Sequence, residues 1–168
     1  MMKPELEGEA LIVGDNIDTD MICPGRYLEL TDPKEIGSHC LGGLDEKIAA
    51  NFPKGGFVVA GRNFGCGSSR EHAAIALKEM GASAVIAKSF ARIFYRNAIN
   101  LGLPLIVCSR ASDEIQNGQR LRIDLSSGLI TNMTTGETLK AEPFSEKALE
   151  ILSAGGIIQL MKKKHCKV

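Results

Sequence analysis

Residues 55–108 carry the clearest secondary-structure pattern of the chain and read GGFVVAGRNFGCGSSREHAAIALKEMGASAVIAKSFARIFYRNAINLGLPLIVC. Within it, short apolar runs bounded by glycine, proline or polar residues predict buried strands at Phe57–Ala60, Ala84–Ala87 and Pro104–Cys108. Between these runs, residues 70–80 and 89–100 carry apolar side chains at helical spacing. Strand–helix–strand units in succession predict parallel strands joined by right-handed crossovers.

One boundary of each predicted helix can be read from the sequence. The first is expected to end at Gly81, because glycine commonly follows the last turn of a helix. The second is expected to begin after Ser89, whose hydroxyl would cap its first turn. Its apolar stripe would consist of Phe90, Ile93, Phe94 and Leu101.

The chain before this stretch predicts one strand, a loop and short helices. Residues 6–13 read as a short strand that ends at Gly14, and residues 15–30 are rich in Asp, Gly and Pro, which predicts a loop. Asp32-Pro33 favours the start of a helix that ends before Gly42, because aspartate caps helices and proline suits the first turn. A second short helix is expected over residues 44–51.

The last third of the chain changes character. Polar and apolar residues alternate over residues 121–125, and Gly-containing turns lead into residues 129–134 and 138–141, which predicts an antiparallel meander. A helix is expected over residues 144–153, and the apolar residues 157–160 predict a last strand. The whole chain, residues 1–168, is therefore expected to form a single α/β domain with parallel core strands and an antiparallel extension.

Composition excludes several classes of function. Lys+Arg and Asp+Glu both number 20, and a formal net charge of zero argues against broad capture of nucleic acid. No apolar run approaches the roughly 20 residues that span a bilayer, and the N-terminus lacks a secretory pattern, so we expect a cytoplasmic protein with no membrane contact. The five cysteines show no Cys-x-x-Cys spacing, which predicts reduced thiols and no metal site in this chain.

The loop from residue 61 to residue 72 carries most of the chemistry. It opens a predicted helix, whose unpaired N–H groups and dipole favour an anion. Ser68 and Ser69 add hydroxyl donors, and the planar guanidinium of Arg70 fits a carboxylate or phosphate with two parallel hydrogen bonds. The local pattern favours anion binding, with a plain serine helix cap as the alternative. No Gly-Lys-Ser/Thr ends the loop, so it is not a Walker loop.

Two further residues near this loop are candidates for supporting roles. His72 falls one turn inside the predicted helix, where a core position or a supporting contact is more common than direct catalysis. Arg92 shares a broad face of the next predicted helix with Arg96 and Asn97. That face fits either a site or a salt-bridged surface.

Three segments together resemble one family. Residues 64–73 (FGCGSSREHA) closely resemble the swivelling domain of the aconitase superfamily, and residues 89–97 (SFARIFYRN) are similar to its next segment. Residues 14–20 (GDNIDTD), followed by residues 24–28 (PGRYL), look like the first loop of isopropylmalate dehydratase small subunits. The resemblance covers the first two thirds of the chain, and the last third matches only in length and pattern.

The resemblance implies a swivelling β/β/α fold and a hydro-lyase activity. Family enzymes move a hydroxyl group between adjacent carbons of a small hydroxy-diacid by dehydration and rehydration. In two-subunit members, a separate large subunit holds a [4Fe–4S] cluster whose open iron acts as a Lewis acid. This chain is therefore expected to need a large, cluster-bearing partner and to be inactive alone.

Carried over by position, the resemblance also implies residue roles. Ser68 would be the general base that takes a proton from carbon, which requires activation of its hydroxyl by the helix start and by Arg70. Ser69 and Arg70 would bind a substrate carboxylate, and Asp20 would belong to a supporting acidic group. Cys66 stands where some relatives carry glutamate, so no role is assigned to its side chain.

Substrate specificity is expected to reside in residues 27–30, with Tyr27, Glu29 and Leu30 as the candidate contacts. Relatives that act on tricarboxylic acids carry an arginine near here. The alignment places Glu29 or Leu30 at that position, which disfavours a third carboxylate and accepts an alkyl group. Isopropylmalate, an intermediate of leucine biosynthesis, is the first expectation. Dimethylmalate, methylmalate-type acids and, given the nearby Arg26, homoaconitate stay open.

Two other classes of function are alternatives to the enzyme. A stand-alone anion-binding regulatory module would use the same helix start without a partner or a cluster. RNA binding is disfavoured by the zero net charge and by the content of only two tyrosines and six phenylalanines.

Overall fold

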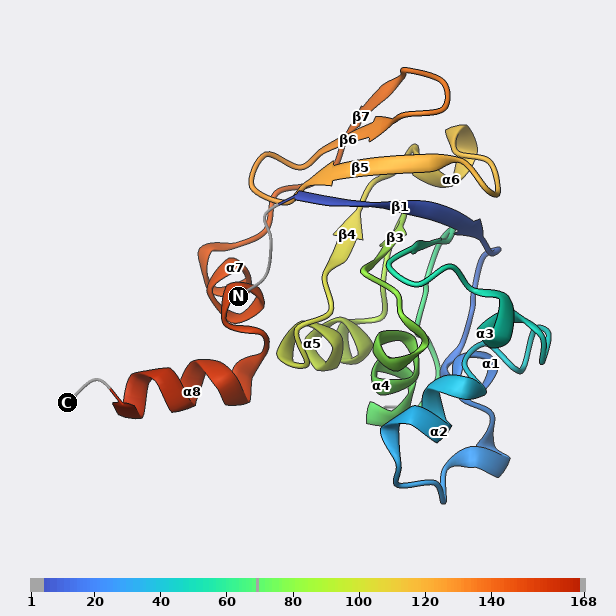
Figure 1. The fold of residues 1–168 in the computed structure, drawn as a ribbon, viewed down its shortest axis with the longest axis vertical. Helices are drawn as coiled ribbons and strands as arrows, with labels where there is room; N and C mark the ends of the chain where they lie inside the picture. The colour runs from blue at the N-terminus through green and yellow to red at the C-terminus, as the bar shows by residue number, and fades with distance from the viewer. Residues whose placement is uncertain (1–4, 69, 167–168) are drawn as a thin grey trace.

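The computed structural model describes residues 5–68 and 70–166, and its strands form one seven-stranded mixed sheet in the order β4-β3-β2-β1-β5-β6-β7. The strands are β1 (Glu5–Ile12), β2 (Phe57–Val59), β3 (Ala84–Ala87), β4 (Leu105–Val107), β5 (Arg120–Asp124), β6 (Leu129–Asn132) and β7 (Thr138–Lys140). In Figure 1, β5, β6 and β7 lie together above β1, and the helices α4 and α5 lie below it.

Strand β1 joins the parallel and antiparallel halves of the sheet. It pairs in parallel with β2, where Ala10 lies opposite Phe57, and antiparallel with β5, where Leu6 lies opposite Ile123. β2, β3 and β4 are parallel to one another, whereas β5, β6 and β7 are antiparallel. The predicted α/β class, with a parallel core and an antiparallel extension, is confirmed.

Both faces of the parallel strands are buried. Side chains alternate along a strand, so Val58 and Val85 face the helices α4 (Glu71–Met80) and α5 (Arg92–Asn100). Phe57 and Val59 point to the other face, where they pack with Ile123 and its neighbours from the antiparallel strands. Burial on two sides explains why the strand sequences are continuous apolar runs.

The remaining helices are short except for two at the C-terminal end. They are α1 (Thr19–Ile22), a 3-10 helix at Gly25–Tyr27, α2 (Pro33–Ser38), α3 (Ile48–Asn51), α6 (Ala111–Glu114), α7 (Glu146–Ala154) and α8 (Ile157–Cys166). The cap predicted for α2 is confirmed, because the carboxylate of Asp32 accepts a hydrogen bond from the backbone N–H of Lys34 at 3.1 Å. Within the described ranges, no helix combines the length and the apolar character that crossing a bilayer requires.

The strand predicted at residues 157–160 is wrong, because these residues begin α8. Leu160 is buried while Ile158 is 61% exposed, so only one helical face of the run packs, against α7 and α5. A short apolar run followed by charged residues fits such a helix as well as it fits a strand. The helix expected over residues 44–51 is also shorter than predicted, since α3 begins at Ile48.

The predicted start of α5 is wrong as well. The N-cap residue is Ala91, and the hydroxyl of Ser89 instead accepts a hydrogen bond from the backbone N–H of Asn63 at 2.8 Å. The helix begins later because Phe90 forms a parallel bridge with Phe64. Ile93, placed in the apolar stripe, is 55% exposed.

Candidate functional site

Three loops that are far apart in the sequence meet at one edge of the sheet. They follow the carboxyl ends of β1, β2 and β3, which are adjacent parallel strands. Such ends open to the same side of a sheet, where ligands bind in many α/β proteins. The loops are residues 13–20, 60–68 and 88–91, and they contain the segments singled out from the sequence.

Backbone hydrogen bonds join the first loop to the second. The N–H of Gly65 donates to the carbonyl of Ile17 at 2.8 Å, and the N–H of Thr19 donates to the carbonyl of Cys66 at 2.8 Å. Asp18 and Cys66 form a parallel bridge, and the carboxylate of Asp18 caps α1 through the N–H of Met21 at 2.7 Å. The start of α1 is thereby fixed against the loop that precedes Ser68.

The second loop is joined to the third in the same way. The N–H of Phe64 donates to the carbonyl of Ser89 at 3.1 Å, and the N–H of Ala91 donates to the carbonyl of Phe64 at 3.0 Å. The ring of Phe64 is fully buried and lies edge-on to Phe94, with ring centroids 5.5 Å apart. The buried contact between Phe64 and Phe94 therefore anchors this loop to the core.

The glycines of the second loop are required by close packing. Gly65 has φ +85°, and a Cβ at this position would lie 2.2 Å from Cγ of Phe94. Gly67 has φ +98°, and its Cβ would lie 3.2 Å from Oγ1 of Thr19. Both values of φ are costly for residues with a Cβ. The loop can pass over Phe94 and Thr19 only with glycine at these positions.

A cavity of about 270 Å³ opens where the loops meet. It is lined by Thr19, Gly65, Gly67, Ser68, Arg70, Ala91, Arg92, Ile93, Phe94 and Asn97. These lining residues include two arginines and no carboxylate, so positive charge dominates the wall that the structure describes. Arg70 and Ala91 are the N-cap residues of α4 and α5, and neither caps its helix with a side-chain hydrogen bond. Two helix starts therefore also favour an anion here.

Ser68 and Arg70 lie together at this cavity. Ser68 is exposed, and its Oγ lies 3.4 Å from Oγ1 of the buried Thr19. Nη1 of Arg70 lies 3.4 Å from Oδ1 of Asp20, whose side chain is 68% exposed. This long, solvated pair occupies one of the five guanidinium N–H groups. Arg70 is therefore left with donors for a ligand.

The other predicted site residues divide into two groups. Arg92 lines the cavity, and Asp20 forms an ion pair with Arg70, which also lines it. His72 is half-buried, and its Nε2 lies 3.3 Å from the carbonyl oxygen of Leu30, so it contacts the proposed specificity loop. Ser69 lies outside the described residues.

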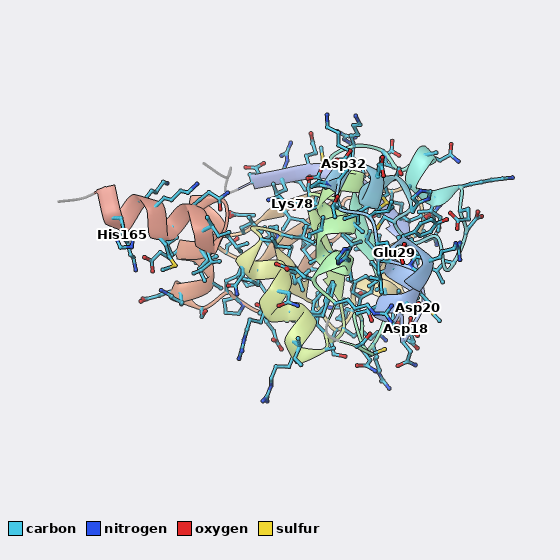
Figure 2. The ribbon with its side chains drawn as sticks, turned by 90° about the horizontal axis from the view of Figure 1, so that it is seen from below. Asp18, Asp20, Glu29, Asp32, Lys78 and His165 are labelled. Carbon is cyan, nitrogen blue, oxygen red and sulfur yellow. The ribbon has the colours of Figure 1, made fainter. Side chains whose placement is uncertain are left out.

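The structure does not place Tyr27, Glu29 and Leu30 among the residues that line the cavity. The ring of Tyr27 stacks on His39 at 3.8 Å, and its hydroxyl donates to Glu46 at 3.0 Å. The hydrogen bond from Tyr27 and the ion pair with Arg26 hold the pKa of Glu46 below its ordinary value. Figure 2 shows Glu29, Asp18 and Asp20 toward the end of the molecule opposite His165.

The cysteines near the site differ in access. Burial raises the pKa of the Cys23 and Cys40 thiols, whereas Cys66 is only half-buried. Cys108 lies apart from them, in the core on the other face of the sheet. In the part of the chain that the structure covers, no three His, Cys, Asp or Glu side chains are grouped as metal ligands would be.

Sequence reasoning missed Thr19 and Phe94 as residues of the cavity, whereas the helix face that Asn97 shares with Arg92 was offered as a possible site. Thr19 was quoted only as part of a motif, and its burial depends on a loop almost fifty residues away. Phe94 was assigned to an apolar stripe. The helical spacing of five residues between Arg92 and Asn97 was the signal for that face.

Comparison with known proteins gives consistent results. The aconitase C-terminal domain matches residues 15–110. The 3-isopropylmalate dehydratase small subunit of Ruminiclostridium cellulolyticum is 53% identical over 156 residues, which cover 93% of this chain and 96% of that protein. The isopropylmalate/citramalate isomerase small subunit of Methanocaldococcus jannaschii is 48% identical over 163 residues and covers 97% of each chain.

A solved structure agrees with these matches. The crystal structure of 3-isopropylmalate dehydratase from Methanocaldococcus jannaschii superposes with a TM-score of 0.92 at 49% identity and covers 96% of each chain. Fold, sequence and length thus match together over nearly the whole chain. The chain therefore belongs to the aconitase C-terminal domain family and, within it, to the 3-isopropylmalate dehydratase small subunits.

Proposed function

We propose that this chain is the small subunit of a two-subunit hydro-lyase that interconverts 2-isopropylmalate and 3-isopropylmalate in leucine biosynthesis. The observation that carries the proposal is one cavity that brings Ser68 and Arg70, at the start of α4, together with Arg92, at the start of α5. The relatives that are about half identical to this chain are named as small subunits of isopropylmalate enzymes, which supports the substrate and the need for a larger partner subunit.

The charge and size of the cavity suit a small diacid. Arg70 and Arg92 offer guanidinium groups for carboxylates, and the two helix starts add to the positive potential. A volume of about 270 Å³ lies just below the roughly 300–1,000 Å³ of sites that enclose drug-sized ligands. A site that a second chain completes would have this size and an open side.

In the proposed mechanism, Oγ of Ser68 takes a proton from the substrate carbon next to the carbon that carries the hydroxyl group. The developing double bond expels the hydroxyl, and addition of water with the opposite orientation gives the isomer. A [4Fe–4S] cluster on the large subunit would supply a Lewis acid for the departing hydroxyl. Arg70 would hold a substrate carboxylate and stabilise the charged form of Ser68, and Ser69 would add a further carboxylate contact.

Residues 27–30 are proposed to contact the alkyl group of the substrate after closing toward the cavity. His72 contacts the carbonyl of Leu30, which places the end of this loop beside α4, the helix whose N-cap residue Arg70 lines the cavity. Loop closure over a substrate is a common way to exclude water from a site. Tyr27, Glu29 and Leu30 would then form the wall that disfavours a third carboxylate.

Citramalate is the second candidate substrate. It is supported by the relative from Methanocaldococcus jannaschii, which is named an isopropylmalate/citramalate isomerase and is 48% identical. Pocket contacts with a methyl or two change selectivity by only about 1–3 kcal/mol. One site can therefore serve both alkyl malates, and their relative kcat/KM values distinguish the candidates.

The test uses the chain assembled with its cluster-loaded large subunit. Ser68→Ala should lower kcat for isopropylmalate about 100- to 10,000-fold, as loss of a general base does, while the complex still forms. Ser153→Ala, an exposed serine on α7, is the matched control and should behave as the parent chain. Turnover by Ser68→Ala equal to that of the control would overturn the base assignment.

A further inference from the structure

A second hydroxyl lies beside the proposed base. Thr19 begins α1, is only 2% exposed, and places its Oγ1 3.4 Å from Oγ of Ser68. A buried hydroxyl needs a hydrogen-bond partner, because leaving it unpaired costs free energy. Within the described ranges, the side-chain hydrogen bond found for Thr19 is the one with Ser68.

The backbone fixes Thr19 in this place. Its N–H donates to the carbonyl of Cys66 at 2.8 Å, and Asp18 immediately before it caps the same helix. Gly67 passes so close to Oγ1 of Thr19 that a Cβ would lie 3.2 Å away. A β-branched side chain is also restricted at χ1. The Thr19 hydroxyl therefore keeps one position relative to Ser68, whose own side chain is exposed.

We propose that Thr19 is a positioning residue for Ser68, whose hydroxyl it orients and whose charged form it stabilises. In the neutral pair either hydroxyl can be the donor. Once Ser68 has lost its proton, only Thr19 can donate. This inference rests on the proposed function, since it assigns a partner to the proposed base.

The length of the contact between Thr19 and Ser68 fits a hydrogen bond that strengthens during the reaction. At 3.4 Å it is longer than the usual O–H···O distance of about 2.7–2.8 Å. Hydrogen bonds to a charged oxygen are shorter and roughly twice as strong as neutral ones. The contact should tighten as charge builds on Ser68, and an interaction that strengthens toward the transition state raises kcat rather than substrate affinity.

The experiment compares Thr19→Val, which keeps the shape and loses the hydroxyl, with Thr19→Ser, which keeps the hydroxyl. Each variant is assembled with the large subunit, and kcat and KM are measured across pH. Thr19→Val should lower kcat roughly ten- to a hundredfold with a smaller change in KM, and Thr19→Ser should restore most of the loss. The acid side of the pH profile should move to higher pH in Thr19→Val, because the charged form of Ser68 is less stabilised. A merely structural role would not give this combination.

A double-mutant cycle separates this inference from the proposed function. If Thr19 acts through Ser68, the double variant Thr19→Val/Ser68→Ala should be no slower than Ser68→Ala alone. If Ser68→Ala is inactive while Thr19→Val matches the parent chain in kcat and pH profile, only the Thr19 role fails. If Ser68→Ala retains turnover, the base assignment fails and the role of Thr19 fails with it. Should Thr19→Val not fold, Thr19→Ala takes its place against the same Thr19→Ser control.

Discussion

Replacement of Gly65 by alanine tests whether the site loop depends on its contact with the aromatic cluster. Gly65 has φ +85°, and a Cβ there would lie 2.2 Å from Cγ and 2.4 Å from Cδ2 of Phe94. Phe94 is 3% exposed and packs edge-on against Phe64, so displacing its ring would disturb this buried aromatic contact. The added methyl group must therefore displace either the ring or the loop.

The expected loss of unfolding free energy in Gly65→Ala has two parts. The left-handed backbone conformation costs a residue with a Cβ about 1–2 kcal/mol. Extra volume in a packed core costs typically about 1–3 kcal/mol. Gly65→Ala should therefore lower the free energy of unfolding by about 2–5 kcal/mol, a large share of the stability of a single domain.

Two other glycines separate these parts. Gly118 has φ +86° with no heavy atom within 4 Å of its would-be Cβ, so Gly118→Ala should show the backbone cost alone. Gly14 has neither a positive φ nor a neighbour within 4 Å, so Gly14→Ala should stay within about 0.5 kcal/mol of the parent chain. Urea unfolding of the three variants gives the differences from the midpoint and the slope. Equal losses for Gly65→Ala and Gly118→Ala would refute the steric contact with Phe94.

Two further predictions concern groups near the site. Cys66 should react with iodoacetamide before Cys23 and Cys40, because it is half-buried whereas burial raises the pKa of the other two thiols. Peptide mapping of the native chain after labelling measures the three rates, and equal rates would contradict the prediction. The attachment of residues 25–30 should weaken in acid, because a hydrogen bond from Tyr27 and the pairing with Arg26 lower the pKa of Glu46. The stabilisation that ionised Glu46 gives to this loop is complete above the ordinary pKa of glutamate. It is lost as pH falls through the lowered pKa of Glu46 in the folded chain. Hydrogen exchange of this loop, corrected for intrinsic rates, should report the change, and Glu46→Gln should abolish the pH dependence; a dependence that persists in this variant would count against Glu46.

Local patterns in the sequence predicted most of the fold because they reflect local physics. The strand at Phe57–Val59 is a continuous apolar run because both faces of it are buried, and its two β-branched valines and the glycines before it favour a strand over a helix. The cap at Asp32 and the end of α4 at Gly81, which adopts φ +110°, follow from side-chain and backbone preferences of single residues. Such features need no knowledge of distant contacts.

Two of the wrong predictions depend on distant contacts. Ser89 would cap a helix in isolation, but its hydroxyl accepts from Asn63 in another loop. Residues 157–160 have apolar side chains that suit a strand, but only a helix presents Leu160 to α5 and α7 while Ile158 stays exposed. Where two local structures are nearly equal in free energy, packing decides between them.

The candidate site shows the same division between local and distant information. Arg70 and Ser68 stand beside one helix start, so sequence alone could associate them with an anion. Arg92 and Thr19 join them only because β1 and β3 flank β2 in the sheet, which brings the loops after all three strands to one edge. The sequence predicted a strand at residues 6–13 without a partner. Pairing of β1 at the far side of β4 instead would have left Thr19 out of reach of Ser68, so the position of this one strand decides whether the proposed base has a neighbour.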